Sequence, residues 1–149
     1  MLWILRHADA EDTDGRPDAE RPLTEKGRAQ ARAVGGALAA LGVRLDACLS
    51  SPLVRALDTA VLACEPLGVD VHVTGELGGG RFDPDRLASG FGAHVLLVGH
   101  NPDVAQAVFD VTGARVRMRK AALAGIDDGE LHVFLRPAEL AAIASRRAG

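Results

Sequence analysis

The chain has 149 residues, and its 17 Lys and Arg residues against 20 Asp and Glu residues give a formal net charge of -3. This length is typical of one domain with its own hydrophobic core, so we expect a single domain over residues 1–149. The net negative charge argues against a protein that binds nucleic acid through bulk electrostatics. No apolar run approaches the roughly 18 residues of a membrane span, and Arg6 and His7 end the first apolar run too early for a secretory signal. We therefore expect a cytoplasmic protein that does not bind membranes.

Hydrophobic periodicity predicts strands that alternate with helices along the chain. In chain order the expected elements are a strand to residue 7, a loop at 8–22, a helix at 24–41, a strand at 45–50, a helix to about 67, a strand at 69–73, a flexible connection at 75–80, a short helix from 83 or 84 to about 91, a strand at 95–98, a helix to 113, a hairpin of strands at 121–126 and 131–135, and a helix from 137 to about 146. This order predicts an α/β fold, a three-layer α/β/α sandwich with a mixed, mostly parallel central sheet, because the final hairpin adds antiparallel pairing.

Particular residues mark the expected starts of three helices. Thr24 is a suitable N-cap for the first helix. Ser51 as N-cap, with Pro52 at the first helical position, is expected to open the second. Asn101 and Pro102 are expected to cap the helix that follows the central strand in the same way.

Polar residues gather where three of the expected strands end. Arg6 and His7 end the first strand, Arg55 lies one turn into the helix after the second, and His100 ends the central strand. Ligands of open α/β sheets bind beyond the carboxyl ends of the strands, so we expect these four side chains to converge. Arginine forks and helix N-termini favour phosphoryl oxygens, and a neutral histidine can attack phosphorus. The pattern predicts a phosphoryl pocket.

Each of these residues also has an interpretation without chemistry. Arg6 could neutralise the nearby Asp9 and Glu11. Arg55 could be a solvated first-turn arginine, and His100 could be a structural histidine with its hydrogen bonds satisfied.

The sequence predicts neither a metal nor a cofactor. A site built on two histidines is disfavoured, because zinc and hard metals favour carboxylates or thiols and the groups expected to converge are arginines. Cys48 and Cys64 lie in apolar runs without a partner at metal-site spacing, which indicates buried thiols. The basic residues that follow Gly113, namely Arg115, Arg117 and Arg119, are expected to solvate an edge rather than extend an anion surface.

Four segments occur in an informative order along the chain. They are Leu5-Arg6-His7-Ala8-Asp9-Ala10, Arg21-Pro22-Leu23-Thr24-Glu25-Lys26-Gly27, Ser50-Ser51-Pro52-Leu53-Val54-Arg55-Ala56 and Val98-Gly99-His100-Asn101-Pro102. Together they resemble the histidine phosphatase superfamily, also called phosphoglycerate-mutase-like, over nearly the whole chain. The small size, the second and fourth segments and Lys120-Ala121-Ala122-Leu123 are most similar to the SixA phosphohistidine phosphatase group. Ala8 stands where the wider superfamily has Gly, a replacement found among SixA-like chains.

The resemblance implies a role for each matching residue. His7 would be the nucleophile that takes the phosphoryl group and forms a phosphohistidine intermediate, from which water releases phosphate. Arg6, Arg55 and His100 would complete the phosphate pocket, where fixed donors stabilise the charge of a phosphoryl group in transfer. The attacking nitrogen of His7 must be unprotonated, which requires a group such as a backbone carbonyl to hold the proton on the other nitrogen.

Three further residues have candidate roles. Arg21 matches an additional arginine found near the substrate in SixA-like proteins, and Asn101 is a candidate substrate-binding residue. Glu76 is the nearest match to the acidic proton donor of larger family members, but SixA-like proteins lack much of the segment that positions this acid. Glu76 as a general acid and Glu76 as an exposed loop carboxylate therefore both remain open.

The resemblance implies a metal-independent phosphatase whose substrate is protein phosphohistidine and whose product is phosphate. The chain has no long insertion that would build a lid over a small molecule, and an open pocket would admit a side chain of another protein. Two alternatives remain open. One is a phosphatase for a small phosphoester metabolite, and the other is a non-enzymatic module that recognises phosphate.

Overall fold

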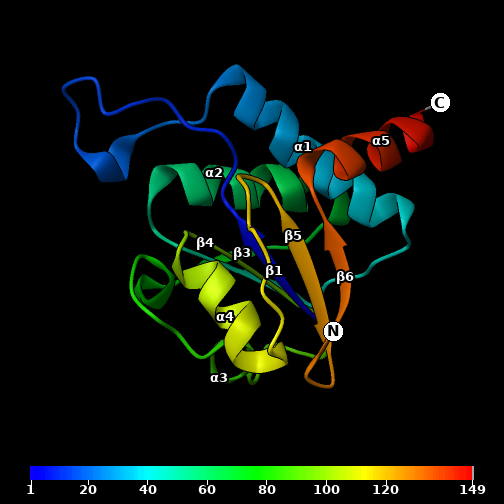
Figure 1. The fold of residues 1–149 in the computed structure, drawn as a ribbon. Helices are drawn as coiled ribbons and strands as arrows, with labels where there is room; N and C mark the ends of the chain where they lie inside the picture. The colour runs from blue at the N-terminus through cyan, green and yellow to red at the C-terminus, as the bar shows by residue number, and fades with distance from the viewer. Residues whose placement is uncertain (149) are drawn as a thin grey trace.

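The computed structural model describes the backbone of residues 1–148 and the side chains of residues 1–146. Its centre is a six-stranded sheet in the order β3-β2-β4-β1-β5-β6, shown in Figure 1. The strands are β1 (Leu2–Arg6), β2 (Ala47–Ser50), β3 (Val71–Val73), β4 (Val95–Gly99), β5 (Leu123–Asp127) and β6 (Glu130–Leu135). The first four strands pair in parallel, whereas β5 pairs antiparallel with both β1 and β6. The prediction of a mixed, mostly parallel sheet is confirmed.

Helices cover both faces of this sheet. They are α1 (Glu25–Ala40), α2 (Val54–Cys64), α3 (Pro84–Ala88), α4 (Asp103–Thr112) and α5 (Pro137–Ala148), with short 3-10 turns η1 (Asp18–Glu20), η2 (Glu65–Leu67) and η3 (Gly75–Leu77). In Figure 1, α1, α2 and α5 lie on one face, and α3 and α4 lie on the other. This arrangement is the expected three-layer α/β/α sandwich. None of the described helices is long and apolar enough to cross a membrane.

The core forms on both sides of the central strands because successive side chains of a strand point to opposite faces. Leu5 of β1 packs in a cluster with Leu38 of α1. Its neighbour Ile4 packs in a second cluster with Val108 of α4. All five residues of β4 are buried, as expected for a parallel strand covered on both faces. The carboxyl ends of β1 and β4 are therefore fixed by packing on two sides.

The predicted cap at Ser51 is wrong. Helix α2 begins at Val54 with Leu53 at its N-cap position and without a side-chain cap, so Pro52 lies outside the helix. The Ser51 hydroxyl accepts a hydrogen bond from the Leu53 N-H over 3.1 Å and lies 2.8 Å from Nε2 of His100. The Ser51 side chain, which the local sequence predicts as a helix cap, therefore makes a tertiary contact with His100 instead.

The predicted cap at Asn101 is wrong for a similar reason. Pro102 occupies the N-cap position of α4, which begins at Asp103. The Asn101 side-chain amide instead donates to the carbonyl oxygen of Met118 over 2.8 Å. Asn101 thus joins the end of β4 to the segment that precedes β5.

Several element boundaries also differ from the predictions. The loop at 8–22 contains η1, the connection at 75–80 begins with η3, α2 gives way to η2 after Cys64, α3 ends at Ala88, and β5 begins at Leu123. At the start of η3 the Thr74 hydroxyl accepts a hydrogen bond from the Glu76 N-H over 3.4 Å, and the Leu77 N-H donates to the Thr74 carbonyl oxygen over 3.3 Å. Hydroxyl side chains commonly compete with regular structure in this way.

Candidate active site

Neighbouring strand ends bring His7 and His100 together. Arg6, the last residue of β1, is in register with Gly99, the last residue of β4. The His7 N-H then donates to the Gly99 carbonyl oxygen over 3.0 Å. The two imidazole rings that follow lie with their centroids 5.2 Å apart. β2 pairs with the other edge of β4, so the third strand end, which leads to α2, meets them at the same edge of the sheet.

His7 is held in one tautomer by its own backbone segment. Its side chain is buried, and Nδ1 lies 2.7 Å from the carbonyl oxygen of Ala8. Because a carbonyl oxygen only accepts hydrogen bonds, Nδ1 carries the proton and Nε2 keeps its lone pair. The Ala8 carbonyl is thus the group that holds the proton on the second nitrogen of His7.

The surroundings of His7 keep its ring neutral. Burial is the largest cause that lowers the pKa of His7 to about 3, the nearby His100, Arg55 and Arg6 contribute to the same shift, and the hydrogen bond to Ala8 opposes it. Desolvation disfavours the charged imidazolium, and neighbouring cations repel it. At neutral pH, His7 therefore offers an unprotonated nitrogen.

Thr59 of α2 positions the backbone next to His7. Its hydroxyl accepts a hydrogen bond from the Ala8 N-H over 3.0 Å and donates to the Arg55 carbonyl oxygen over 2.6 Å. Thr59 is fully buried. One hydroxyl thus connects the backbone beside His7 to the helical turn that carries Arg55.

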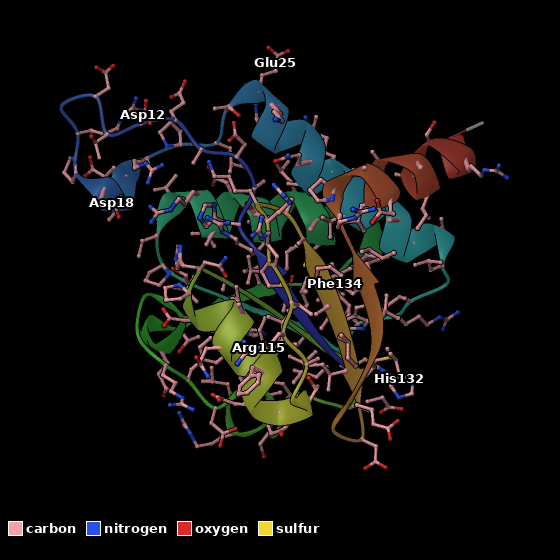
Figure 2. All side chains as sticks on the ribbon, in the orientation of Figure 1. Asp12, Asp18, Glu25, Arg115, His132 and Phe134 are labelled. Carbon is pink, nitrogen blue, oxygen red and sulfur yellow. The ribbon has the colours of Figure 1, made fainter. Side chains whose placement is uncertain are left out.

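Arg55 is buried rather than solvated, with 8% of its surface exposed. Its Nη1 donates to the Asp18 carbonyl oxygen over 2.9 Å, and its Nη2 lies 3.2 Å from Oδ2 of the Asp18 carboxylate. The η1 turn of the long loop therefore closes over this end of α2. Figure 2 shows Asp18 on that loop, to the left of the start of α2.

Arg6 makes no ion pair with Asp9 or Glu11 among the described residues. Its Nη1 donates instead to the Met118 carbonyl oxygen over 3.1 Å. Burial lowers the pKa of Arg6, and repulsion from Arg55 lowers it further. The Arg6 guanidinium is thus close enough to Arg55 to be affected by its charge.

Arg21 contacts Asp18, which in turn contacts Arg55. Its Nε donates to the Glu11 carbonyl oxygen over 2.7 Å, and its Nη1 lies 3.1 Å from Oδ1 of Asp18. The two oxygens of the Asp18 carboxylate are therefore shared between Arg21 and Arg55. The hydrogen bond from Arg21, aided by Arg55, holds the pKa of Asp18 below its usual value.

Three donors at the site have no partner within the protein. Among the described residues, the buried side-chain polar atoms without a hydrogen bond are Arg6 Nε, Arg55 Nε, His100 Nδ1 and Trp3 Nε1. Buried polar groups are nearly always hydrogen-bonded, so three exceptions at one sheet edge need an explanation. The three residues share the ability to donate to an anion. Burial, with Arg55 as the next cause, lowers the pKa of His100 to about 4.

Comparison with known proteins agrees with this geometry. Residues 2–81 match the family model of the histidine phosphatase superfamily, branch 1. The chain belongs to this superfamily. An uncharacterised protein of Picosynechococcus sp. is 35% identical over 144 residues, which cover 89% of this chain and 87% of the relative.

Solved structures place the chain within the family beside SixA proteins. A structure assigned as the phosphohistidine phosphatase SixA from Agrobacterium tumefaciens has a TM-score of 0.79 at 27% identity, covering 91% of this chain and 97% of that one. The protein histidine phosphatase SixA in complex with tungstate has a TM-score of 0.78 at 26% identity, covering 93% of this chain and 98% of that one. The family and these neighbours support phosphatase activity.

Two candidate site residues, Glu76 and Asn101, do not lie directly beside the two histidines in the contacts that the structure describes. Glu76, in η3, is half-exposed, and its carboxylate pairs with Arg86 of α3. It makes no hydrogen bond or ion pair with His7 or the two site arginines among the described residues. Asn101 lies closer, since its amide and Arg6 donate to the same Met118 carbonyl oxygen.

Sequence reasoning missed three residues that organise the site, namely Asp18, Thr59 and Ser51. Asp18 precedes Arg21 by three residues, which is the spacing at which a 3-10 turn brings side chains together. Ser51 directly follows a strand end, where functional side chains gather. Thr59 left no comparable signal, because its partner Ala8 is 51 residues away.

The structure describes no group of three or more His, Cys, Asp or Glu residues placed to hold a metal ion.

Proposed function

We propose that the protein is a metal-independent phosphatase that forms a phosphohistidine intermediate on His7 and acts on protein phosphohistidine. The observation that carries this proposal is the combination of a neutral His7 ring with three unpartnered donors around it. An interaction module that only recognises phosphate would use the donors but would have no need for an unprotonated Nε2.

The reaction proceeds in two transfers. In the first, Nε2 of His7 attacks the phosphorus, the bond between phosphorus and the substrate nitrogen breaks, and that nitrogen leaves with the electron pair and takes a proton. In the second, a water molecule attacks the phosphorus on His7, gives up a proton and releases phosphate, and the lone pair returns to Nε2. Splitting the reaction in this way is the general advantage of covalent catalysis.

Arg6, Arg55 and His100 stabilise both transfers. The negative charge of a phosphoryl group in transfer spreads over its equatorial oxygens, and donors held in place stabilise that charge without rearrangement. Arg6 Nε, Arg55 Nε and His100 Nδ1 are free to supply such hydrogen bonds. The Ser51 hydroxyl lies 2.8 Å from His100 Nε2 and is able to donate there, a direction that keeps the proton of His100 on Nδ1.

Two further residues complete the proposed site. We propose Arg21 as a third guanidinium of the site, supported by its contact with the same Asp18 carboxylate that Arg55 contacts. Glu76 is a proton donor only for leaving groups that need one, since it lies on the loop after β3 and pairs with Arg86. A histidine leaving group gains its proton near neutral pH and has less need of this help.

The proposed substrate class follows from the neighbours and from the open site. Both SixA structures are of phosphohistidine or protein histidine phosphatases, and they match this chain over nearly its full length. We propose that residues 1–149 act as a single domain. We also propose a cytoplasmic setting, where thiols such as the buried Cys48 and Cys64 stay reduced.

A substrate panel tests this function. Phosphate release is followed for a phosphohistidine-bearing phosphotransfer domain and for a set of sugar phosphates and nucleotides, with the wild type and His7→Ala, with and without a chelator. We expect release from the protein substrate by the wild type alone and no effect of the chelator. Faster turnover of a small phosphoester would favour the metabolite phosphatase, and equal release by both proteins would exclude the mechanism.

A further inference from the structure

A basic groove opens beside the proposed phosphoryl pocket. It has a volume of about 770 Å³ and is lined by Arg6, Asp9, Lys26, Gln30, Arg119, Lys120, Arg136, Pro137 and Ala138. This volume lies within the range of pockets that bind ligands of drug size. The groove therefore has room for more than the phosphoryl group itself.

The groove carries positive charge although the whole chain is negative. Its lining contains five basic side chains and a single carboxylate, whereas the chain as a whole has 20 acidic and 17 basic residues. Such local concentration of one sign of charge in a concave surface attracts an oppositely charged ligand and speeds its association. The charge distribution points to an anionic occupant.

The one carboxylate of the groove is occupied by hydrogen bonds of its own. Oδ2 of Asp9 accepts from the Thr24 hydroxyl over 2.7 Å, and Oδ1 lies 3.2 Å from Nζ of Lys120. The start of α1 lies so close that a Cβ on Gly27 would be 1.9 Å from the Asp9 carbonyl oxygen. Asp9 therefore pairs directly with Lys120, and the charge of Lys26 also acts on it from a greater distance.

Two basic side chains of the groove remain available to a ligand. Lys26 and Arg119 are exposed, and within residues 1–146 neither pairs with a carboxylate at 4.0 Å or less. Arg136, by contrast, pairs with Glu139 over 2.8 Å. Lys26 and Arg119 come from α1 and from the segment before β5, so they are brought together only by the fold. Arg119, which the sequence predicts at a solvated edge, is exposed and also lines this groove.

Arg6 joins the groove to the phosphoryl pocket. It lines the groove, and it is also close enough to Arg55 and His7 to lower the pKa of His7. A phosphorylated side chain that enters the pocket thus leaves the rest of its partner next to Lys26 and Arg119. A small phosphoester has no further residues to place there.

We propose that this groove binds an acidic segment of the phosphorylated partner protein, with Lys26 and Arg119 as its specificity-determining residues. The inference rests on the proposed action on protein phosphohistidine and adds the chemistry by which a partner is chosen. Complementary charge of this kind fixes orientation and favours the correct partner over others. Because the two side chains are exposed, the preference weakens as salt screens their charge.

Matched peptides test the groove. Two phosphohistidine peptides of equal length are compared with the full chain, one with Asp and Glu on both sides of the phosphohistidine and one with Asn and Gln in their place. At low ionic strength we expect a KM about tenfold lower for the acidic peptide, in line with two exposed charge contacts. In Lys26→Ala/Arg119→Ala the ratio of the two KM values should fall close to one, and Lys26→Arg/Arg119→Lys should restore it.

The control variant is Arg115→Ala/Arg117→Ala, which removes the same charge from exposed positions nearby. Arg115 lies against α4, as Figure 2 shows, and neither Arg115 nor Arg117 is among the residues that line the groove. This variant should keep the wild-type preference. Equal KM values for the two peptides in the wild type, or the same loss of preference in both double variants, would overturn the proposal.

A binding measurement separates failure of the groove from failure of the proposed function. Fluorescence anisotropy reports binding of the two peptides in unphosphorylated, labelled form, without any turnover. If neither phosphopeptide is hydrolysed, the proposed function fails, yet tighter binding of the acidic peptide that depends on Lys26 and Arg119 still supports the groove. Equal binding of both peptides, or tighter binding of a single-stranded oligonucleotide of the same charge, overturns the groove.

Discussion

Nδ1 of His7 donates a hydrogen bond of 2.7 Å to the carbonyl oxygen of Ala8, the next residue in the chain. This contact fixes the tautomer of the proposed nucleophile without any second side chain. It also relies on a backbone carbonyl, which cannot accept a proton as a carboxylate can. Burial and three neighbouring basic groups then keep the ring neutral, and the same arrangement has a consequence for stability.

Stability should fall as the pH is lowered from about 6.5 toward 4. The pKa of His7 is lowered to about 3 and that of His100 to about 4, so both rings stay neutral in the folded protein while they gain protons in the unfolded chain. Each ring then reduces the free energy of unfolding by up to about 1.4 kcal/mol per pH unit. Urea unfolding at pH 7, 6 and 5 measures this slope.

The variant His100→Asn provides the comparison for that measurement. It removes one of the two titrating rings, so its stability should fall less steeply between pH 6 and 5, by up to about 1.4 kcal/mol per unit. The carboxylates that also titrate are the same in both proteins and cancel in the difference. Identical slopes would mean that His100 is not held neutral by the fold.

Thr59→Val should destabilise the protein and slow turnover. The change leaves the buried Ala8 N-H without its acceptor, which costs about 1–3 kcal/mol. Thr59→Ser keeps the hydroxyl and loses only a methyl group, at about 1 kcal/mol. Thermal unfolding and kcat are measured for both, and a role in positioning His7 predicts that kcat falls more in the Val variant. Equal kcat values would leave Thr59 with a purely structural role.

Asp18→Asn should strengthen the binding of anions. The Asp18 carboxylate pairs with both Arg55 and Arg21, and its negative charge repels an incoming phosphoryl group. The side-chain amide oxygen of the Asn variant carries no charge but still accepts a hydrogen bond from Arg55. Because Asp18 is exposed, we expect a fall of only about threefold in the inhibition constant of inorganic phosphate. A rise in that constant would show that the charge of Asp18 is needed to hold Arg55 in place.

Glu76→Gln should affect phosphohistidine turnover weakly. The carboxylate is half-exposed and pairs with Arg86, and a histidine leaving group needs little acid catalysis. The fall in kcat should therefore be far smaller than the factor of about 100 that loss of a general acid costs. The test compares kcat of the variant on a phosphohistidine protein and on a phosphoester. A loss of that size on the phosphohistidine protein would identify Glu76 as its proton donor.

The sequence predicts the placement of the two histidines and two arginines because a simple rule governs it. Side chains that follow parallel strands meet at one edge of the sheet, so His7 and His100 could be placed together from their positions in two apolar runs. The three-layer fold follows from the alternation of strands and helices along the chain. Both predictions depend on periodicity, which the sequence carries directly.

The contacts that complete the site could not be predicted in this way. The Asp18 carboxylate meets Arg55 across 37 residues, and the Arg6 guanidinium meets the Met118 carbonyl across 112. Ser51 illustrates the reason, since its hydroxyl suits a helix cap locally yet lies against His100 in the fold. Local propensity is overridden where tertiary contacts offer a better partner.

The central claim is that His7 carries the phosphoryl group during turnover. The direct test is brief exposure of the protein to a ³²P-labelled phosphohistidine domain, followed by an alkaline quench and mapping of the labelled peptide. We predict an acid-labile, alkali-stable label on the peptide that contains His7, which is absent in His7→Ala and retained in Arg115→Ala/Arg117→Ala. Substrate hydrolysis by the wild type without any labelled enzyme, or a label that persists in His7→Ala, would contradict the account.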